Sequence, residues 1–220
     1  MKKITILGSC RQDSLYKRYD VTSIKNDISY PHYTKEILQL IKWCLYNNIS
    51  TNDTLYTFRS AILKNRGIEW NVNIYQEFVN SDIFIIEIAS RISYLYNNLY
   101  VHHILHDDPN YKKKNIVVRD LTDTEITNDI KEICSLINKP IIIVGHIVTI
   151  KTGKRYELSK LISNTCKELN ILFIDPVEEI TKRGHNILDL VDTNEKHYNH
   201  YNDKGHSVIS DIYNDYLNTL

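Results

Sequence analysis

Short apolar runs alternate along this chain with longer stretches in which apolar residues recur every three or four positions, and this alternation constrains the fold most. The runs are continuous instead of alternating apolar with polar, which is typical of strands buried on both faces of a parallel sheet. They are Ile4–Leu7, Ile83–Ile88, Ile116–Val118, Ile141–Ile147 and Ile171–Ile174. The helix-like stretches are Thr34–Tyr46, Ile74–Val79, Thr124–Ile137, Leu158–Leu169 and Asp203–Leu217, and Thr122-Asp123-Thr124-Glu125 is typical of an N-cap that opens the third of them. The pattern predicts an α/β fold, a three-layer α/β/α sandwich around a mainly parallel sheet.

Nothing in the sequence divides the chain into parts. Its 220 residues fit the usual size of one domain. No internal repeat, low-complexity tract or linker rich in proline and glycine interrupts it. We therefore expect a single domain over residues 1–220, either as a whole protein or as one domain of a longer chain.

Charge and targeting signals exclude several classes of function. Lys and Arg number 27, as do Asp and Glu, so the net charge of zero gives no general attraction to nucleic acid or to an anionic membrane. Met1-Lys2-Lys3 leads directly into the first apolar run, without the longer apolar segment of a secretion signal or a membrane span. We expect a cytoplasmic protein with no nucleic-acid partner, no membrane insertion and reduced, unpaired cysteines.

Polar clusters follow three of the predicted strands. They are the segments 8–11 (Gly-Ser-Cys-Arg), 87–91 (Glu-Ile-Ala-Ser-Arg) and 145–146 (Gly-His). In parallel sheets, ligands bind beyond the carboxyl ends of the strands, so these clusters predict a shared site at one edge of the sheet. His146 either lines that site or is a buried histidine with its hydrogen bonds satisfied.

Ser9 is the candidate nucleophile because it follows a strand and a glycine. In such a turn its hydroxyl projects outward, and the amides of Ser9 and Cys10 lie at a helix N-terminus where they can stabilise an oxyanion. The alternative is that Ser9 only caps the following helix. Cys10 is a second candidate, since a helix N-terminus lowers a thiol pKa, but we expect Cys10 to turn into the fold.

The segment 197–206 (His-Tyr-Asn-His-Tyr-Asn-Asp-Lys-Gly-His) brings three histidines to the start of the last helix. A serine after the first strand and a histidine near the C-terminus together indicate Ser/His acyl chemistry. The alternative is a surface loop that caps the last helix through Asn202 or Asp203.

Both ends resemble the SGNH (GDSL-like) hydrolase superfamily. Ile-Leu-Gly-Ser-Cys is similar to its first block in a Gly-Ser-Cys form, and the C-terminal segment is similar to its last block, an Asp-x-x-His followed by an Asn-x-x-Gly-His-like run. The resemblance implies a flavodoxin-like sheet with His200 as the catalytic base and Asn202 in the expected place. His197 then stands where that block has its aspartate.

The acid that supports the histidine stays open. Ser9 and His200 can work as a dyad, or Asp192 or Glu195 can reach His200 from the preceding loop. His206, which follows Asp203 by three residues, is a further candidate base. We prefer His200, because His206 is expected to lie within the last helix.

The middle blocks of the superfamily match poorly. Where its third block has Gly-x-Asn, this chain has the segment 87–91, so we expect Ser90 to donate to the oxyanion and Arg91 to grip an anionic or carbonyl group. The alternative is a buried Glu87 paired with Arg59 or Arg91. Arg59 stands in Phe-Arg-Ser at a plausible position for the second block.

A histidine-rich segment after residue 101 invites a metal-site interpretation. His102 and His106 would share a helical face, His103 lies between them, and two aspartates, Asp107 and Asp108, follow. However, Pro109 and the lysines at 112–114 indicate an exposed connection, and no fourth ligand is identifiable. We expect no metal.

The resemblance implies that Ser9 attacks an acyl carbonyl while His200 acts as general base and then as acid. The superfamily includes esterases and acetyltransferases. We expect an acetyltransferase that uses acetyl-CoA and a sugar or nucleotide-sugar hydroxyl or amine, because segments 87–91 and 197–201 look like those of uncharacterised SGNH-like proteins of polysaccharide biosynthesis. The alternatives are a carbohydrate esterase or deacetylase, and an inactive glycan-binding module.

Overall fold

The structure, a computed structural model, describes residues 2–22, 24, 28, 30–192 and 200–220. Its centre is a five-stranded parallel sheet in the order β2-β1-β3-β7-β8. The strands are β1 (Lys3–Leu7), β2 (Asp20–Val21), β3 (Ile83–Ile88), β7 (Ile141–Gly145) and β8 (Leu172–Ile174). This order is that of the flavodoxin-like doubly wound fold, so the predicted parallel α/β sandwich is confirmed.

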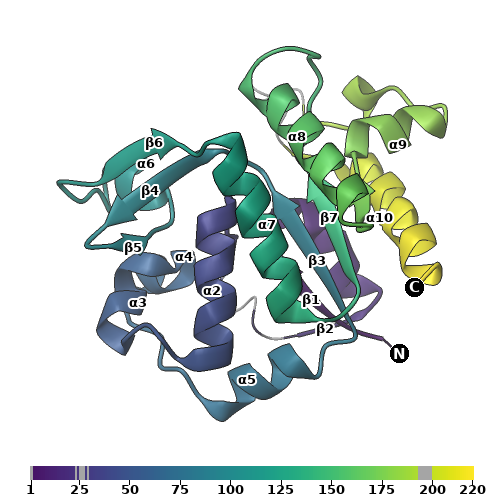
Figure 1. The fold of residues 1–220 in the computed structure, drawn as a ribbon. Coiled ribbons are helices and arrows are strands. Elements are labelled where there is room, and N and C mark those ends of the chain that lie inside the picture. Colours follow the sequence, from purple (N-terminus) through teal and green to yellow (C-terminus); the bar gives the residue numbers. More distant parts are fainter. Residues whose placement is uncertain (1, 23, 25–27, 29, 193–199) are drawn as a thin grey trace.

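Helices cover both faces of the sheet (Figure 1). One face packs against α2 (Thr34–Tyr46), α5 (Val72–Val79), α7 (Asp123–Ile137) and α8 (Lys154–Glu168). The other packs against the 3-10 helix η1 (Cys10–Lys17), α9 (Pro176–Lys182) and α10 (Asp203–Asn218). Along β3, successive isoleucine and phenylalanine side chains enter the two cores in turn, which explains why its sequence is apolar throughout.

A second, three-stranded antiparallel sheet follows β3 directly. Its order is β5-β4-β6, with β4 (Ile92–Tyr96), β5 (Leu99–Tyr100) and β6 (Val117–Asp120). Short helices accompany it: α3 (Thr51–Thr57), α4 (Arg59–Lys64) and α6 (Ile104–Asp107). Figure 1 places this sheet beside the upper ends of α2 and α7, apart from the main sheet.

The prediction of a buried strand at Ile116–Val118 is wrong. The strand that forms there, β6, is an exposed edge strand of the small sheet and pairs antiparallel with β4. An apolar run of three residues does not separate a core strand from an edge strand, since that depends on which partner the tertiary fold provides.

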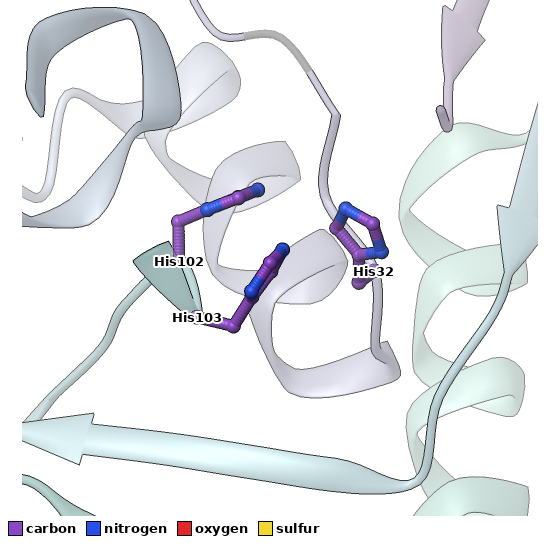
Figure 2. Close-up of side chains that lie close together, drawn as sticks. All are labelled: His32, His102 and His103. Atoms are coloured by element: carbon purple, nitrogen blue, oxygen red, sulfur yellow. The ribbon is translucent and has the colours of Figure 1, made fainter. Parts of the chain in front are cut away.

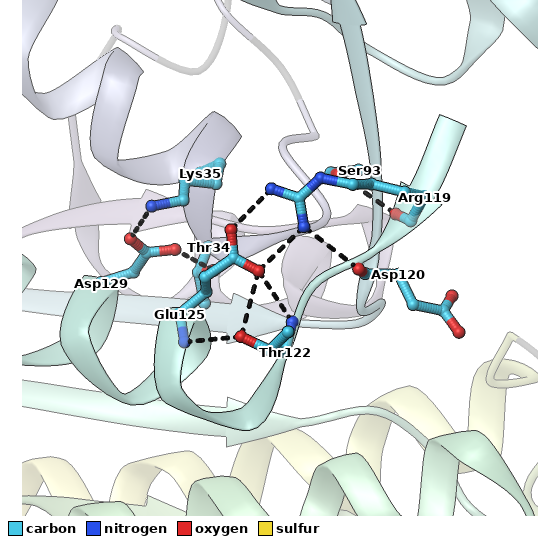
Figure 3. Close-up of polar contacts among 8 residues, drawn as sticks. All are labelled: Thr34, Lys35, Ser93, Arg119, Asp120, Thr122, Glu125 and Asp129. Atoms are coloured by element: carbon cyan, nitrogen blue, oxygen red, sulfur yellow. Dashed lines mark hydrogen bonds and ion pairs between the residues drawn. The ribbon is translucent and has the colours of Figure 1, made fainter. Parts of the chain in front are cut away.

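The start of α7 follows the sequence signal closely. Thr122 and Glu125 form a capping box, in which Glu125 N donates to Thr122 Oγ1 and Thr122 N donates to the Glu125 carboxylate. Arg119 of β6 binds the same carboxylate, and Asp129 on the next turn accepts from Thr34 and Lys35 of α2 (Figure 3). These contacts fix α7 between the small sheet and α2.

Two further observations concern the whole described chain. All four cysteines are free, as expected from their spacing. No described helix combines the length and the apolar character that a bilayer crossing needs.

Candidate active site

A cavity of about 1000 Å³ opens at the carboxyl ends of β1, β3 and β7. The chain order reverses between β1 and β3, which is the position where doubly wound sheets bind ligands. The residues from the sequence prediction that line this cavity are Ser9, Cys10, Arg59, Ser90, Arg91, His146 and His200. Residues from all three polar clusters that follow β1, β3 and β7 therefore line one common cavity.

Ser9 follows β1 and is held by Glu87, which belongs to β3. The Ser9 hydroxyl donates to Oε2 of Glu87 at 2.5 Å, and the Ser9 amide donates to the same oxygen at 2.8 Å. A side chain at Gly8 would place its Cβ 2.8 Å from the Glu87 Cβ, so the glycine allows this close approach. Ser9 also caps η1, because Arg11 N donates to its hydroxyl oxygen at 3.3 Å.

The Ser9 amide is therefore not available as we expected. We predicted that the amides of Ser9 and Cys10 would both be free for an oxyanion, but Glu87 already accepts from the first of them. A buried carboxylate needs several donors to remain charged, and this backbone amide is one of them.

Glu87 forms a buried ion pair with Arg11. Nε of Arg11 lies 2.5 Å from Oε1 of Glu87, and both side chains are almost completely buried. Burial raises the pKa of Glu87, but the Arg11 guanidinium and the hydrogen bonds from Ser9 and Arg11 outweigh it and hold the pKa below its ordinary value. Glu87 is thus a carboxylate that orients Ser9 and a poor acceptor for its proton.

The expected buried pair exists, but its cation is neither of the two proposed. Arg91 instead pairs with Asp123 at 2.6 Å, and the Arg59 guanidinium lies over the Tyr30 ring, 4.9 Å from its centre. Arg11 belongs to the polar cluster after the first strand. Because Glu87 stands at the end of the strand next to β1, its burial was the sequence signal from which the pair with Arg11 could have been predicted.

His146 contributes a neutral imidazole to the cavity. Its Nδ1 lies 2.7 Å from the carbonyl oxygen of Ile147, so Nδ1 carries the hydrogen and Nε2 keeps its lone pair. Burial and the Arg11 guanidinium lower the pKa of His146. The imidazole therefore stays uncharged at neutral pH and is a weak base, and its Nε2 lone pair can accept a hydrogen bond.

His200 lines the same cavity, on the side contributed by the C-terminal segment. Within the described part of the chain, Ser9 makes no hydrogen bond to a histidine, since its hydroxyl binds Glu87. His197 and Glu195 lie outside the described residues. His206 lies in α10 as expected, against the Tyr201 ring, and does not line the cavity.

Asn202, which the resemblance places in the C-terminal block, caps α10 and is not among the residues that line the cavity. Its Oδ1 accepts from Gly205 N at 2.9 Å and caps α10, while its Nδ2 donates to the carbonyls of Asp189 and Val191. The capping alternative from the sequence thus describes Asn202 correctly, because the first turn of a long helix needs acceptors for its free amides.

Cys10 differs from the expectation in two respects. It lines the cavity and is more exposed than Ser9, so it does not turn into the fold. Burial raises the pKa of its thiol, and this outweighs the lowering effect of Arg11. The thiol is consequently protonated at neutral pH.

Ser90 and several unpredicted residues complete the wall. The Ser90 hydroxyl oxygen accepts from Ile92 N at 3.0 Å, which leaves its own hydrogen to donate. From the sequence, Arg11 was placed in a site-forming cluster without being given a role, and His32 was missed altogether. His32 comes from an irregular segment ahead of α2, where no periodic pattern indicates which way a side chain points.

His32 also changes the grouping of the other histidines. His102 precedes α6 and His103 caps it, so His102 and His106 do not share a helical face as predicted. The imidazoles of His32, His102 and His103 face one another in the cavity wall (Figure 2).

Comparisons with known proteins give distant likenesses only. No protein-family profile and no curated protein matches the chain. Among solved structures, the acetylxylan esterase Axe2 from Geobacillus stearothermophilus aligns at 13% identity and a TM-score of 0.43, over 96% of this chain and 92% of its own.

Two other solved structures align over most of their length. A GDSL-like lipase from Bacteroides thetaiotaomicron aligns at 9% identity and a TM-score of 0.45, over 99% of this chain and 88% of that one. A mutant of the esterase AlinE4 aligns at 14% identity and a TM-score of 0.37, over 100% of this chain and 96% of that one. With TM-scores below 0.5, these alignments establish neither the family nor the activity of this chain.

Proposed function

We propose that this chain is an SGNH-type serine esterase that hydrolyses an acetyl ester on a carbohydrate. One observation supports the proposal above all. Ser9, oriented by Glu87 at the end of β1, shares one cavity with two histidines, His146 and His200. Hydrolysis is the simplest activity for such a site, because water is the acceptor and only one organic substrate has to be bound.

In the proposed mechanism, the Ser9 oxygen attacks the ester carbonyl and its proton passes to an imidazole. Glu87 is unsuited to take that proton because its own pKa is held low. We assign the base to His200; His146 is the weaker alternative, because burial and the Arg11 guanidinium lower its pKa as well. Ser9 must leave its hydrogen bond to Glu87 during attack, and hydrogen bonds at a catalytic site often reach their working geometry only with substrate bound.

The oxyanion needs donors other than the Ser9 amide, which Glu87 occupies. We propose the Ser90 hydroxyl and the Cys10 amide. The histidine then protonates the departing sugar oxygen, and water repeats the sequence on the acetyl-enzyme to release acetate.

A second candidate is acetyl transfer from acetyl-CoA to a sugar or nucleotide sugar, as in polysaccharide biosynthesis. Five cationic side chains line the cavity, but Arg11, Arg91 and Lys154 already pair with Glu87, Asp123 and Asp120, so we assign the contact with an anionic ligand to Arg59, which stacks on Tyr30. The cations are Arg11, Arg59, Arg91, Lys154 and Arg155. Arginines bind phosphate groups through paired hydrogen bonds, which the donor coenzyme would supply.

A fluorophosphonate probe tests the nucleophile. We expect labelling of the wild-type chain, loss of labelling in Ser9→Ala and retained labelling in Cys10→Ala. Absence of labelling in the wild type, together with binding of glycans, would support an inactive glycan-binding module instead.

Product analysis separates the two enzymatic candidates. An esterase releases acetate from acetylated sugars without coenzyme. A transferase releases free CoA from acetyl-CoA only when an acceptor sugar is present. Release of CoA that does not depend on sugar would contradict the transferase.

A further inference from the structure

Three imidazoles from two separate segments meet in the wall of the cavity. His32 precedes α2, whereas His102 and His103 lie at the start of α6. One ring nitrogen from each histidine lies within 4.8 Å of the others, and the ring centres are 4.4–5.2 Å apart. Figure 2 shows the His102 and His103 rings side by side, with the His32 ring across a gap from them.

We propose that His32, His102 and His103 form a binding site for one divalent cation of the zinc type. Neutral imidazole suits Zn²⁺, Co²⁺, Ni²⁺ and Cu²⁺, and three histidines leave a fourth position for water or a ligand. Two nitrogens bound to one tetrahedral Zn²⁺ lie about 3.3 Å apart, given bonds of about 2.0–2.1 Å. Side-chain rotations that move the ring nitrogens by about 1 Å each would therefore bring them to metal-binding distance.

The surrounding contacts resemble those that orient metal-binding histidines. Nδ1 of His103 lies 2.9 Å from Oδ2 of Asp107, so its other nitrogen keeps a lone pair. Nε2 of His102 donates to the Tyr30 carbonyl at 3.1 Å, while its Nδ1 accepts from Ile104 N at 3.3 Å. Metal binding through Nδ1 of His102 replaces the contact with Ile104 N and keeps the hydrogen bond from Nε2 to the Tyr30 carbonyl as an outer support.

His32 is positioned through its backbone. Its carbonyl accepts from Ala89 N at 2.9 Å and Ser90 N at 3.0 Å, and its amide donates to Glu36 at 2.8 Å. Its imidazole makes no hydrogen bond within the described part of the chain. A fixed backbone with an unengaged imidazole is what a metal ligand requires.

Burial affects the protonation of two of the three histidines, His32 and His102. Burial, with the neighbouring His103, lowers the pKa of His32 to about 3. Burial, with the neighbouring His32, holds the pKa of His102 well below its ordinary value. Both rings are uncharged at neutral pH, so the metal does not have to displace protons from them.

Calorimetric titration of the full chain with Zn²⁺ alone tests the site, and the visible absorption of bound Co²⁺ reports the coordination. We expect one equivalent to bind and the affinity to fall at least 100-fold in His32→Ala and in His103→Ala. The matched control is His106→Ala, because His106 also binds Asp107, through Nδ1 at 2.8 Å, but lies outside the cluster. This control should retain the wild-type affinity.

Two results would overturn the proposal. One is a wild-type chain that binds Zn²⁺ no more tightly than His103→Ala. The other is an equal loss in His106→Ala, which would place the ion on the exposed face of α6. If either cluster variant unfolds, the anomalous scattering of zinc in crystals of the wild type decides, since the ion must lie within bonding distance of both His32 and His103. The proposal does not depend on acyl chemistry, so Ser9→Ala should bind Zn²⁺ as the wild type does.

Discussion

The hydroxyl of Ser9 donates to Oε2 of Glu87 at 2.5 Å, so the partner of the proposed nucleophile is a carboxylate and not an imidazole. Arg11 holds the other oxygen of that carboxylate. The contact between Ser9 and Glu87 joins the ends of β1 and β3, which are neighbours in the sheet but about eighty residues apart in the sequence. The position of Ser9 and the charge beside it thus depend on the buried ion pair of Glu87 and Arg11.

Removing either partner of this pair should destabilise the fold. We expect Arg11→Ala to lower the free energy of unfolding by about 3–5 kcal/mol, because Glu87 is left as an uncompensated buried charge. Urea denaturation measures the loss. The matched control is Arg18→Ala, which breaks the exposed pair of Arg18 with Asp211 and should cost at most about 1 kcal/mol. Equal losses in the two variants would show that burial does not distinguish the pairs.

Activity measurements on variants of His200, His146 and His206 should show which of these histidines is the general base. We expect His200→Gln to lower kcat for ester hydrolysis by about 10²–10⁴-fold, the usual contribution of a general base. His206→Gln should stay within about twofold of wild type, since His206 packs on Tyr201 outside the cavity. Steady-state kinetics of the three variants, His146→Gln included, decide the assignment. If the large loss occurs in His146→Gln and not in His200→Gln, the base is His146.

Gly8→Ala should disturb the site more than the addition of one methyl group usually does. The added Cβ would lie 2.8 Å from Cβ of Glu87 and 2.9 Å from Oε1 of Gln12, so β1 and β3 must move apart at their carboxyl ends. We expect a loss of stability of about 1–3 kcal/mol and a fall in labelling of Ser9. Gly145→Ala is the comparison, since its nearest neighbour is the edge of the Phe173 ring at 3.2 Å. A loss at Gly145 as large as at Gly8 would argue against a specific effect on the Ser9–Glu87 contact.

Stability should decline toward alkaline pH because of Glu36. Burial raises the pKa of Glu36 to about 8 from an ordinary 4.5, although the amides of His32 and Tyr33 work against this. The folded state therefore holds this proton more tightly than the unfolded state. Its contribution is fully present below pH 4.5 and is lost as the pH rises through about 8.

Glu36→Gln tests this directly, because the amide oxygen can still accept from the backbone. We expect the difference in unfolding free energy, variant minus wild type, to grow in favour of the variant by up to about 4 kcal/mol between pH 5 and 8. Denaturation of both proteins at several pH values measures this difference. The other titratable groups are the same in the two proteins, so their contributions to the pH dependence cancel. A difference that does not change with pH would contradict the raised pKa.

Local patterns were sufficient for the elements that form the core. The continuous apolar runs located β3, the end of β1 and the beginning of β7, and the three- and four-residue spacing located α2 with both of its ends. The capping signal at Thr122 located the start of α7. Such patterns are read correctly from sequence because each concerns residues within one or two turns or one strand.

The composition of the site was decided only by the tertiary structure. The sequence placed Ser9, His146 and His200 at strand ends or beside the last helix, but it did not pair Arg11 with Glu87 or bring His32 to His102 and His103. Those contacts join segments far apart in the chain, and strand order and loop paths determine them instead of any local period. The sequence therefore determined where a site could lie, and the fold determined which charges and imidazoles face one another in it.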